Sequence, residues 1–320
     1  MKGVQTVQSL HIVASCAQGK RCAAPANLRL GSIPDGPLTE RLAAWKLRLA
    51  RSDSDPFAAV DLYRGQHWSV VRDLPIVATE AGFRANLWVA SAGYGLIPAE
   101  AQVRPYSATF AASEEDGVWR SGDGDRRTAF RTWWNGLQAR PDGASLPSLT
   151  SIACEVPDTT MLVIASPAYI LAMADDLAGA RKQLNDPQHL LIVSSRHRSL
   201  PEWLTSHIVP SEAPLSGVLG GALGSLHART ARRMLQESSE EPLRADVLVP
   251  YYEHLISEVE SATVPARLKL RDEDIRTFIL QNRGLPCTAA LRKLRTTGLA
   301  CEQRRFSSLY AEVTRRADVA

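Results

Sequence analysis

The chain of 320 residues is long enough to bury a sizeable core in one large domain or two ordinary ones. Its hydrophobic content of 45% and charged content of 22% are typical of a globular protein and exclude a disordered or fibrous chain. No apolar run approaches the roughly 18 residues that span a bilayer, and the start lacks a signal-peptide pattern, so we expect a cytoplasmic protein without a membrane segment. The five cysteines form no CxxC pair, so we expect neither a disulfide framework nor a zinc site.

Apolar runs and helical patterns alternate along residues 1–237, which we take as the first domain. The run 9–16 predicts a buried strand, and 86–98 predicts a strand followed by a tight loop. Helical spacing covers 38–52 and 126–140. Two further apolar strands and their helices repeat this order in the second half of the domain. The alternation predicts an α/β fold with a mixed, mainly parallel sheet flanked by helices, in which functional residues lie at the carboxyl ends of strands.

Residues 238–320 form the second predicted domain, a helical and basic module that begins with a connection at 238–250. Within it, residues 271–316 carry ten Lys or Arg against five Asp or Glu, a net charge of +5 in a chain whose total is +3. A helix over 272–282, a break at Arg-Gly-Leu-Pro and a helix over 288–297 resemble a helix-turn-helix, which favours duplex DNA as partner. The residues expected to contact DNA are Thr288, Arg292, Lys293, Arg295, Arg304 and Arg305.

Cys16 and Lys20 follow the first strand with three residues between them. A lysine in a loop at the end of a strand can hold a phosphate or stabilise developing negative charge, so Lys20 is a candidate catalytic residue. Cys16 has no evident histidine partner that would activate it as a nucleophile, and we place it among the substrate-binding candidates. A buried small thiol beside a surface lysine is the alternative.

Asp61 opens a polar and aromatic stretch that includes Tyr63, Gly65 and Trp68. A carboxylate here could orient water or stabilise an oxocarbenium-like sugar while a base is removed, which is the chemistry of glycosidases. A helix-capping aspartate among packing aromatics is a strong alternative. Glu100 and Asp116 remain alternative catalytic carboxylates.

Ser91 ends the second strand and opens the sequence Ser-Ala-Gly-Tyr-Gly-Leu-Ile-Pro, and Tyr106 follows in Arg-Pro-Tyr-Ser. Such a loop exposes backbone N–H groups and a hydroxyl to an anion or a base edge. Tyr94 and Tyr106 are candidates to stack on an extruded base. A Gly-containing loop is a weak signal alone, since it matches neither a dinucleotide fingerprint nor a P-loop.

Two later loops complete the set of candidates. Ser166 and Tyr169 follow a strand of the second half, and the Gly-rich stretch 220–229 places Ser225 and Arg229 where they could meet a phosphate at a helix N-terminus. Ordinary turn chemistry explains both loops equally well. The base- or substrate-binding candidates are Cys16, Tyr63, Gly93, Tyr94, Ser166 and Tyr169. Seven scattered histidines show no metal-binding spacing, so we expect no metal site and no organic cofactor.

Taken together, the motifs resemble the YaaA-like peroxide-stress and DNA-modification superfamily. They are Cys16-x-x-x-Lys20, Asp61-Leu-Tyr63-x-Gly65, Ser91-Ala-x-Tyr94-Gly-Leu-Ile-Pro98 and Arg104-Pro-Tyr106. The likeness covers residues 10–110 well and 160–235 loosely, and departs from the family pattern in a longer insert at 21–57 and in the tail.

The resemblance implies DNA binding, because relatives are associated with deazaguanine modification of DNA and with phage defence. The layout of this chain, a compact core with an added basic helical tail, is most similar to the branch of antiviral DNA glycosylases. The resemblance implies an enzyme that flips out a modified base of phage DNA, such as a glucosylated hydroxymethylcytosine, and excises it to leave an abasic site. Its catalytic candidates are Asp61, Lys20, Ser91 and Tyr106. Editing of a 7-deazaguanine without excision, a non-enzymatic DNA-binding stress or repair protein, and a transcriptional regulator are the alternatives.

Overall fold

The computed structural model describes residues 8–111, 115–139, 147–239, 242–261, 268–297 and 299–317. Two compact units divide the chain at Ser261 and Ala262, and each is described by itself. In the described residues no helix is long and apolar enough to cross a membrane.

The first unit is built on a six-stranded sheet with the order β4-β3-β1-β6-β7-β8. All neighbouring strands are parallel except the β3–β4 pair, which is antiparallel. This confirms the predicted mixed, mainly parallel sheet. The strands are β1 (Ser9–Ser15), β3 (Arg84–Ser91), β4 (Gly95–Pro98), β6 (Thr160–Ile164), β7 (Leu190–Ser194) and β8 (Ile208–Pro210). A separate antiparallel pair joins β2 (Phe57–Ala58) to β5 (Gln102–Val103).

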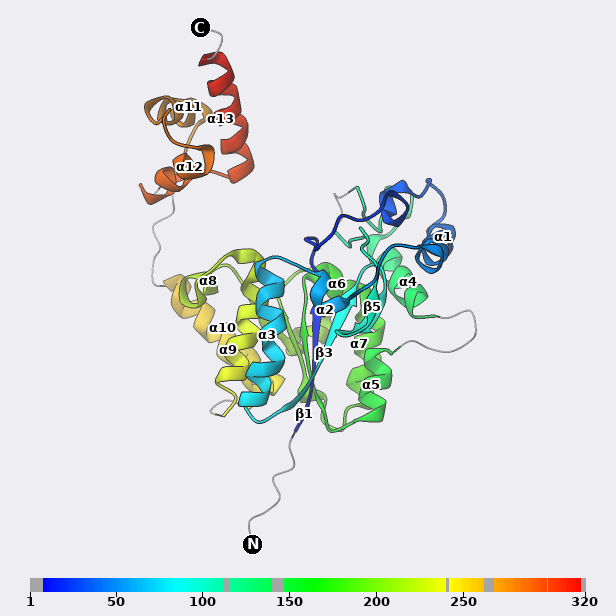
Figure 1. Cartoon of the computed structure of the whole chain (residues 1–320). Coiled ribbons are helices and arrows are strands. Elements are labelled where there is room, and N and C mark those ends of the chain that lie inside the picture. Colours follow the sequence, from blue (N-terminus) through cyan, green and yellow to red (C-terminus); the bar gives the residue numbers. More distant parts are fainter. Residues whose placement is uncertain are drawn as a thin grey trace. The chain divides into compact units, whose positions relative to one another are not determined.

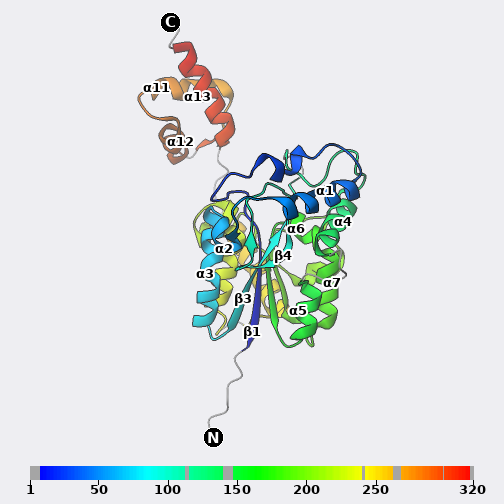
Figure 2. The same ribbon diagram turned by 45° about the vertical axis from the view of Figure 1, so that its right-hand side comes forward.

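Helices cover both faces of this sheet, so β6 and β7 are buried along their whole length. Figures 1 and 2 show α3, α9 and α10 on one face and α4, α5, α6 and α7 on the other. The first group is α3 (Gln66–Glu80), α9 (Leu226–Gln236) and α10 (Ala245–Ser261), and the second is α4 (Arg126–Gln138), α5 (Leu149–Glu155), α6 (Pro167–Ala172) and α7 (Ala174–Gln183). The remaining helices of the unit are α1 (Leu38–Arg51), α2 (Ala59–Leu62) and α8 (Leu215–Leu219).

The strand order reverses at β1, which lies between β3 and β6. The chain runs from β1 through α3 to β3 on one side and later returns to β6 on the other. In open α/β sheets, ligands bind outside the carboxyl ends of strands where such a reversal occurs. The loops after β1 and β6 are therefore the place in this fold to look for a site.

The first unit extends beyond the predicted boundary at residue 237. Helix α10 packs against β8, and its side chains Leu248, Tyr252 and Ile256 are buried in the main core. These three positions recur every four residues, so they form one apolar face of a helix. The prediction placed this helix in the basic module because the polar stretch before it resembled a linker.

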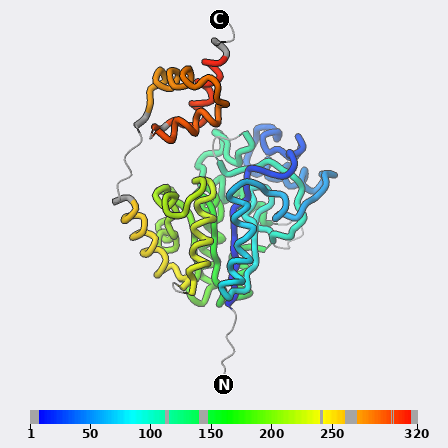
Figure 3. The backbone as a smooth tube through the Cα atoms, turned by 60° about the vertical axis from the view of Figure 1, so that its left-hand side comes forward, coloured from blue at the N-terminus to red at the C-terminus, as the bar shows by residue number. Residues whose placement is uncertain are grey.

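The second unit has its own small core around Ile275, Leu294 and Phe306. Its helices, orange to red in Figure 3, are α11 (Asp272–Gln281), α12 (Cys287–Thr296) and α13 (Gln303–Ala317). Short strands β9 (Leu268–Lys269) and β10 (Leu299–Ala300) pair in parallel. The predicted C-terminal helical module is therefore present, with α11 and α12 in helix-turn-helix order.

Candidate functional site

The loop that leaves β1 is held by backbone hydrogen bonds against the segment before α3. The Arg64 N–H donates to the Gly19 carbonyl at 2.8 Å, and the Arg21 N–H donates to the Leu62 carbonyl at 2.7 Å. Lys20 and Tyr63 lie opposite one another in an isolated antiparallel bridge. Two of the sequence motifs, Cys16-x-x-x-Lys20 and the Tyr63 stretch, are thereby fixed side by side.

A set of hydroxyl groups converges on the Cys16 thiol, and we call it the Cys16–tyrosine network. Tyr106 Oη lies 2.6 Å from Ser91 Oγ and 3.0 Å from Tyr63 Oη, and it donates to Cys16 Sγ at 3.4 Å. Tyr169 Oη is 3.1 Å from the same sulfur. Residues from the end of β1, the end of β3 and helix α6 thus meet at one place, on the carboxyl side of the sheet.

Burial decides the protonation of this network. The pKa values of Tyr63, Tyr106 and Tyr169 are raised well above that of a free phenol, first because burial penalises the phenolate and then because Cys16 lies close by. At neutral pH the three phenols are therefore neutral. They act as hydrogen-bond donors to the thiol and to one another, and not as bases.

Lys20 stands where this network approaches the surface. Its Nζ lies 4.4 Å from the centre of the Tyr106 ring, a cation–π contact. Burial lowers the pKa of Lys20, and the neighbouring Cys16 and Asp116 oppose that shift. Both Cys16 and Lys20 are half-buried, whereas Tyr63, Ser91 and Tyr106 are almost completely inaccessible. Cys16 and Lys20 are consequently the groups of the network that a ligand can reach.

The structure does not bring Asp61 into the network. Its side chain lies on the outside of α2, is 49% exposed and forms an ion pair with Arg72 at 3.4 Å. Glu100 is exposed. Asp116 is buried and lies within electrostatic range of Lys20, but it accepts the Gly31 N–H at 2.8 Å and pairs with Arg29 at 3.0 Å. The expected role of Asp61 at the reacting sugar has no support in this arrangement.

Other predicted contacts are corrected by burial. Ser91 Oγ already accepts the N–H groups of Gly93 and Tyr94, so it has no free side for a base or phosphate. A Cβ atom on Gly93 would lie 2.5 Å from the Tyr106 ring, so this glycine makes room for the tyrosine and not for a ligand. Tyr106 is therefore enclosed and cannot stack on an extruded base. The Tyr94 hydroxyl accepts the Arg104 N–H at 3.0 Å.

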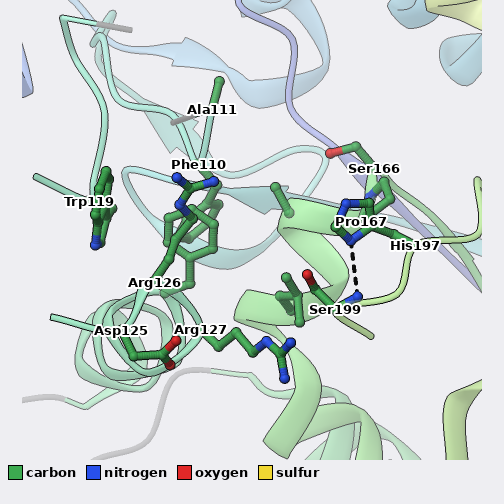
Figure 4. A pocket seen from close by; sticks show the side chains of 13 residues that line it. Phe110, Ala111, Trp119, Asp125, Arg126, Arg127, Ser166, Pro167, His197 and Ser199 are labelled. Atoms are coloured by element: carbon green, nitrogen blue, oxygen red, sulfur yellow. Dashed lines mark hydrogen bonds between the residues drawn. The ribbon is translucent and has the colours of Figure 1, made fainter. Parts of the chain in front are cut away.

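A cavity of about 580 Å³ opens beside the network, over the ends of β6 and β7. Figure 4 shows Phe110, Trp119, Arg126 and Arg127 on one side of it and Ser166, Pro167, His197 and Ser199 on the other. Its inner wall reaches the network through Phe110, whose ring centre is 5.0 Å from that of Tyr169. Ser166 was predicted as a ligand contact, but the arginines and His197 were not.

On the opposite face of the sheet, two histidines missed by the sequence analysis lie near one another. His67 lies in the first turn of α3 and hydrogen-bonds the Ser15 carbonyl, and His227 lies in the first turn of α9. Burial lowers the pKa of both, and for His227 burial together with the neighbouring His67 lowers it to about 4. His67 Nε2 and His227 Nδ1 have no hydrogen-bond partner among the described residues. Residues 160 positions apart carry no sequence signal of such a pairing.

The Gly-rich stretch before α9 is stabilised by its own side chains. Arg229 donates to the Ala222 carbonyl at 2.8 Å and to Ser225 Oγ at 3.2 Å, and Ser225 is buried. Gly221 has a φ of 71°, and a Cβ there would meet the Arg229 guanidinium at 2.8 Å. Ser225 is thus unavailable to DNA, and Arg229 is committed to the loop.

In the C-terminal unit the predicted DNA contacts fall into two groups. Arg292, Arg304 and Thr288 are exposed, and neither arginine pairs with an acidic side chain within the described part of the unit. The others have intramolecular partners: Lys293 with Asn282, Arg295 with the Cys301 carbonyl and Arg305 with Asp272.

Comparison with family models, with curated proteins and with solved structures finds no match. The described residues contain no group of three or more His, Cys, Asp or Glu side chains that could hold a metal ion.

Proposed function

We propose that this chain is a DNA glycosylase, an enzyme that removes a modified base from DNA by breaking its N-glycosidic bond. The observation that carries the proposal is the meeting of Cys16 and Lys20 with Tyr106 at the carboxyl end of β1. Four motifs that are separate in the sequence, and that resemble the YaaA-like superfamily, contribute to this one place. Their convergence supports the proposed membership in that superfamily, and the role in antiviral defence against phage DNA is proposed from the resemblance alone.

Lys20 replaces Asp61 as the residue that we propose for bond cleavage. Burial lowers its pKa, which raises the fraction of neutral amine at a given pH. The amine attacks C1′ of the target nucleotide, and the base leaves with the electron pair of the glycosidic bond and takes up a proton. The resulting N,O-acetal then opens by breaking the C1′–O4′ bond, with O4′ taking up a proton, to give an iminium between Lys20 and the sugar. Water hydrolyses this iminium to an abasic site and frees the amine. The Tyr106 ring holds the Lys20 side chain in place through its protonated form, and the neutral phenol does not act as a base toward it.

The test compares Lys20→Arg with wild type on phage DNA rich in modified bases and on unmodified DNA. Arginine keeps the charge and loses the neutral amine, so base release should fall by at least about 100-fold, the usual scale for a lost nucleophile or acid–base group. Borohydride should trap wild-type protein on DNA and should not trap the variant. Lys182→Arg, on the exposed surface of α7, is the matched control. Full base release by Lys20→Arg, or no abasic site on any substrate, would refute the proposal.

Base editing without excision is the second candidate, because the Cys16 thiol accepts hydrogen bonds from Tyr106 and lies 3.1 Å from Tyr169 Oη. On a 7-cyano-deazaguanine, the sulfur would bond to the nitrile carbon, one π bond would break and the nitrogen would take up the thiol proton, giving a thioimidate. Water would then replace the sulfur at that carbon, which releases the thiol and leaves a carboxamide on the base. A mass change on a base that stays in the strand, lost in Cys16→Ser and retained in Lys20→Arg, would favour it. Base loss without a prior mass change would exclude it.

For the C-terminal unit we propose double-stranded DNA as partner. Arg292 and Arg304 are exposed cations that form no ion pair in its described part, so each is free to neutralise one phosphate. Replacing both by glutamine should reduce the slope of log affinity against log salt by about 2. A DNA-binding protein without enzymatic activity would show this slope and no base release. A cytoplasmic location, where DNA and five free thiols are compatible, belongs to the same proposal.

A further inference from the structure

The cavity over β6 and β7 combines an apolar inner wall with a cationic rim. Phe110, Phe130 and Leu171 form the wall and are almost fully buried. Arg126 and Arg127 at the start of α4 supply the charge on the rim. A volume of about 580 Å³ lies within the range of small-ligand sites, which are mostly apolar with a few oriented polar groups.

The two arginines are available to a ligand. Neither forms an ion pair with a carboxylate in the described residues. Arg126 lies over Trp119, with the guanidinium carbon 4.7 Å from the ring centre, so its plane is oriented by an aromatic surface. Asp125 is the acid in this wall, and Arg127 lies within electrostatic range of it. The Asp125 carboxylate caps α4, with Oδ2 accepting the Thr128 N–H at 2.9 Å. Two guanidinium groups against this one carboxylate leave an excess of positive charge on the rim.

His197 adds a donor from the opposite side. Its Nδ1 accepts the Ser199 N–H at 3.1 Å, so a neutral ring carries its proton on Nε2. The histidine follows β7, and Ser166 follows β6 with a hydroxyl that makes no capping bond to α6. Hydroxyl, imidazole N–H and guanidinium groups on facing walls form a donor set that matches the oxygens of a phosphate.

We propose that this cavity, the Arg126–His197 pocket, binds the phosphate of a nucleotide and places its sugar and base against the apolar wall. The ligand chemistry is inferred from the pocket's own residues and does not depend on cleavage by Lys20. The nucleotide is either free in solution or part of a DNA strand. For a nucleotide in a DNA strand, the next nucleotide would lie beside the Cys16–tyrosine network. The pocket is next to that network because the ring centres of Phe110 and Tyr169 are 5.0 Å apart and Tyr169 Oη is 3.1 Å from Cys16 Sγ.

Calorimetric titration of the full chain with thymidine 5′-monophosphate, thymidine and inorganic phosphate tests the proposal. The nucleotide should bind at least about tenfold more tightly than either part, and Arg127→Gln or His197→Gln should weaken it by about fivefold or more, as expected for one charge-assisted hydrogen bond. Arg232→Gln, on α9 and 39% exposed beside Asp73, is the matched control and should bind as wild type does. Because Arg127 and His197 are exposed, both variants should unfold at the wild-type urea midpoint.

A 5′-phosphorylated thymidine trinucleotide distinguishes the two sources. Tighter binding of the trinucleotide, lost in Arg127→Gln by the same factor, indicates a strand of DNA, whereas equal binding indicates a free nucleotide. Either result supports the pocket. Nucleotide binding that is no tighter than that of thymidine, or that survives both substitutions unchanged, would overturn it. The titration detects no catalysis, so its outcome is separate from the base-release assay.

Discussion

Acidification should weaken the first unit through His227, a half-buried histidine in the first turn of α9. Burial and the neighbouring His67 lower its pKa from 6.5 to about 4. In the unfolded chain the ring takes up a proton as the pH falls below about 6.5, but the folded chain does not until the pH approaches 4. The unfolded state therefore binds more protons between these values, and stability must fall as the pH is lowered through this window.

The size of the effect follows from the two pKa values. A full difference between 6.5 and about 4 corresponds to about 3 kcal/mol of unfolding free energy. At pH 5 the unfolded ring is almost fully protonated and the folded ring almost fully neutral, so about 2 kcal/mol should already be lost relative to pH 7. The pKa values of His67, His11 and His207 are also lowered by burial. These histidines therefore add to the stability that the wild-type protein loses on acidification.

Urea unfolding at pH 7 and pH 5, followed by tryptophan fluorescence, measures this loss. All seven tryptophans lie before residue 262, so the signal reports the first unit alone. His227→Gln removes the titrating group, and its stability should fall by about 2 kcal/mol less than wild type between the two pH values. His254→Gln is the matched control, since that side chain is 75% exposed and pairs only with Glu258 in the described residues.

The comparison rests on differences between two pH values and does not require the variant to match wild type at pH 7. A loss in His227→Gln equal to that of wild type, within about 0.5 kcal/mol, would refute the assignment. It would mean that the His227 ring is solvated in the folded state. Keeping the pH at or above 5 limits the contribution of carboxylates, whose ordinary pKa values lie near 4.

Three further predictions concern stability. Asp176→Ala should cost about 3 kcal/mol in the same fluorescence assay, because its buried carboxylate accepts bonds from Leu149 N and Thr150 N at 3.0 and 2.9 Å. Tyr106→Phe should cost about 1–3 kcal/mol, since the phenol joins Ser91 to the buried network. Phe306→Ala should destabilise the C-terminal unit by about 3–5 kcal/mol, measured by amide hydrogen exchange, and leave the fluorescence midpoint unchanged.

The sequence carried enough information to predict the sheet and to expect that residues of the Cys16–tyrosine network lie close together. Cys16 follows β1 and Ser91 ends β3, and the carboxyl ends of parallel strands meet at one edge, so their proximity follows from the fold class. The hydroxyl contacts of Tyr106 and Tyr169 could not be predicted, because they depend on where α6 and the loop after β5 pack. Gly93 was the available signal for the burial of Tyr106, since a glycine often marks the close approach of another group.

Asp61 shows why adjacency in the sequence was misleading. It lies two residues before Tyr63, but α2 ends at Leu62 and the backbone becomes extended at Tyr63. The tyrosine side chain consequently points into the core, whereas the aspartate stays on the helix surface beside Arg72. A pattern of residue types cannot specify that change of direction, which is set by the packing of α2 against β2 and β5.

Protonation ultimately limits what the Cys16–tyrosine network can do. The three phenols have raised pKa values, so at neutral pH none of them is a phenolate that could accept a proton. Asp61 cannot serve as the base either, because it lies on the surface beside Arg72. The groups within reach of a ligand that can change their protonation or form a bond are Cys16 and Lys20. Any reaction at this end of β1 must therefore use the thiol or the amine, with the phenols fixing their orientation. Base excision and base editing differ in which of the two forms the bond, so Lys20→Arg and Cys16→Ser, assayed on the same DNA, separate them.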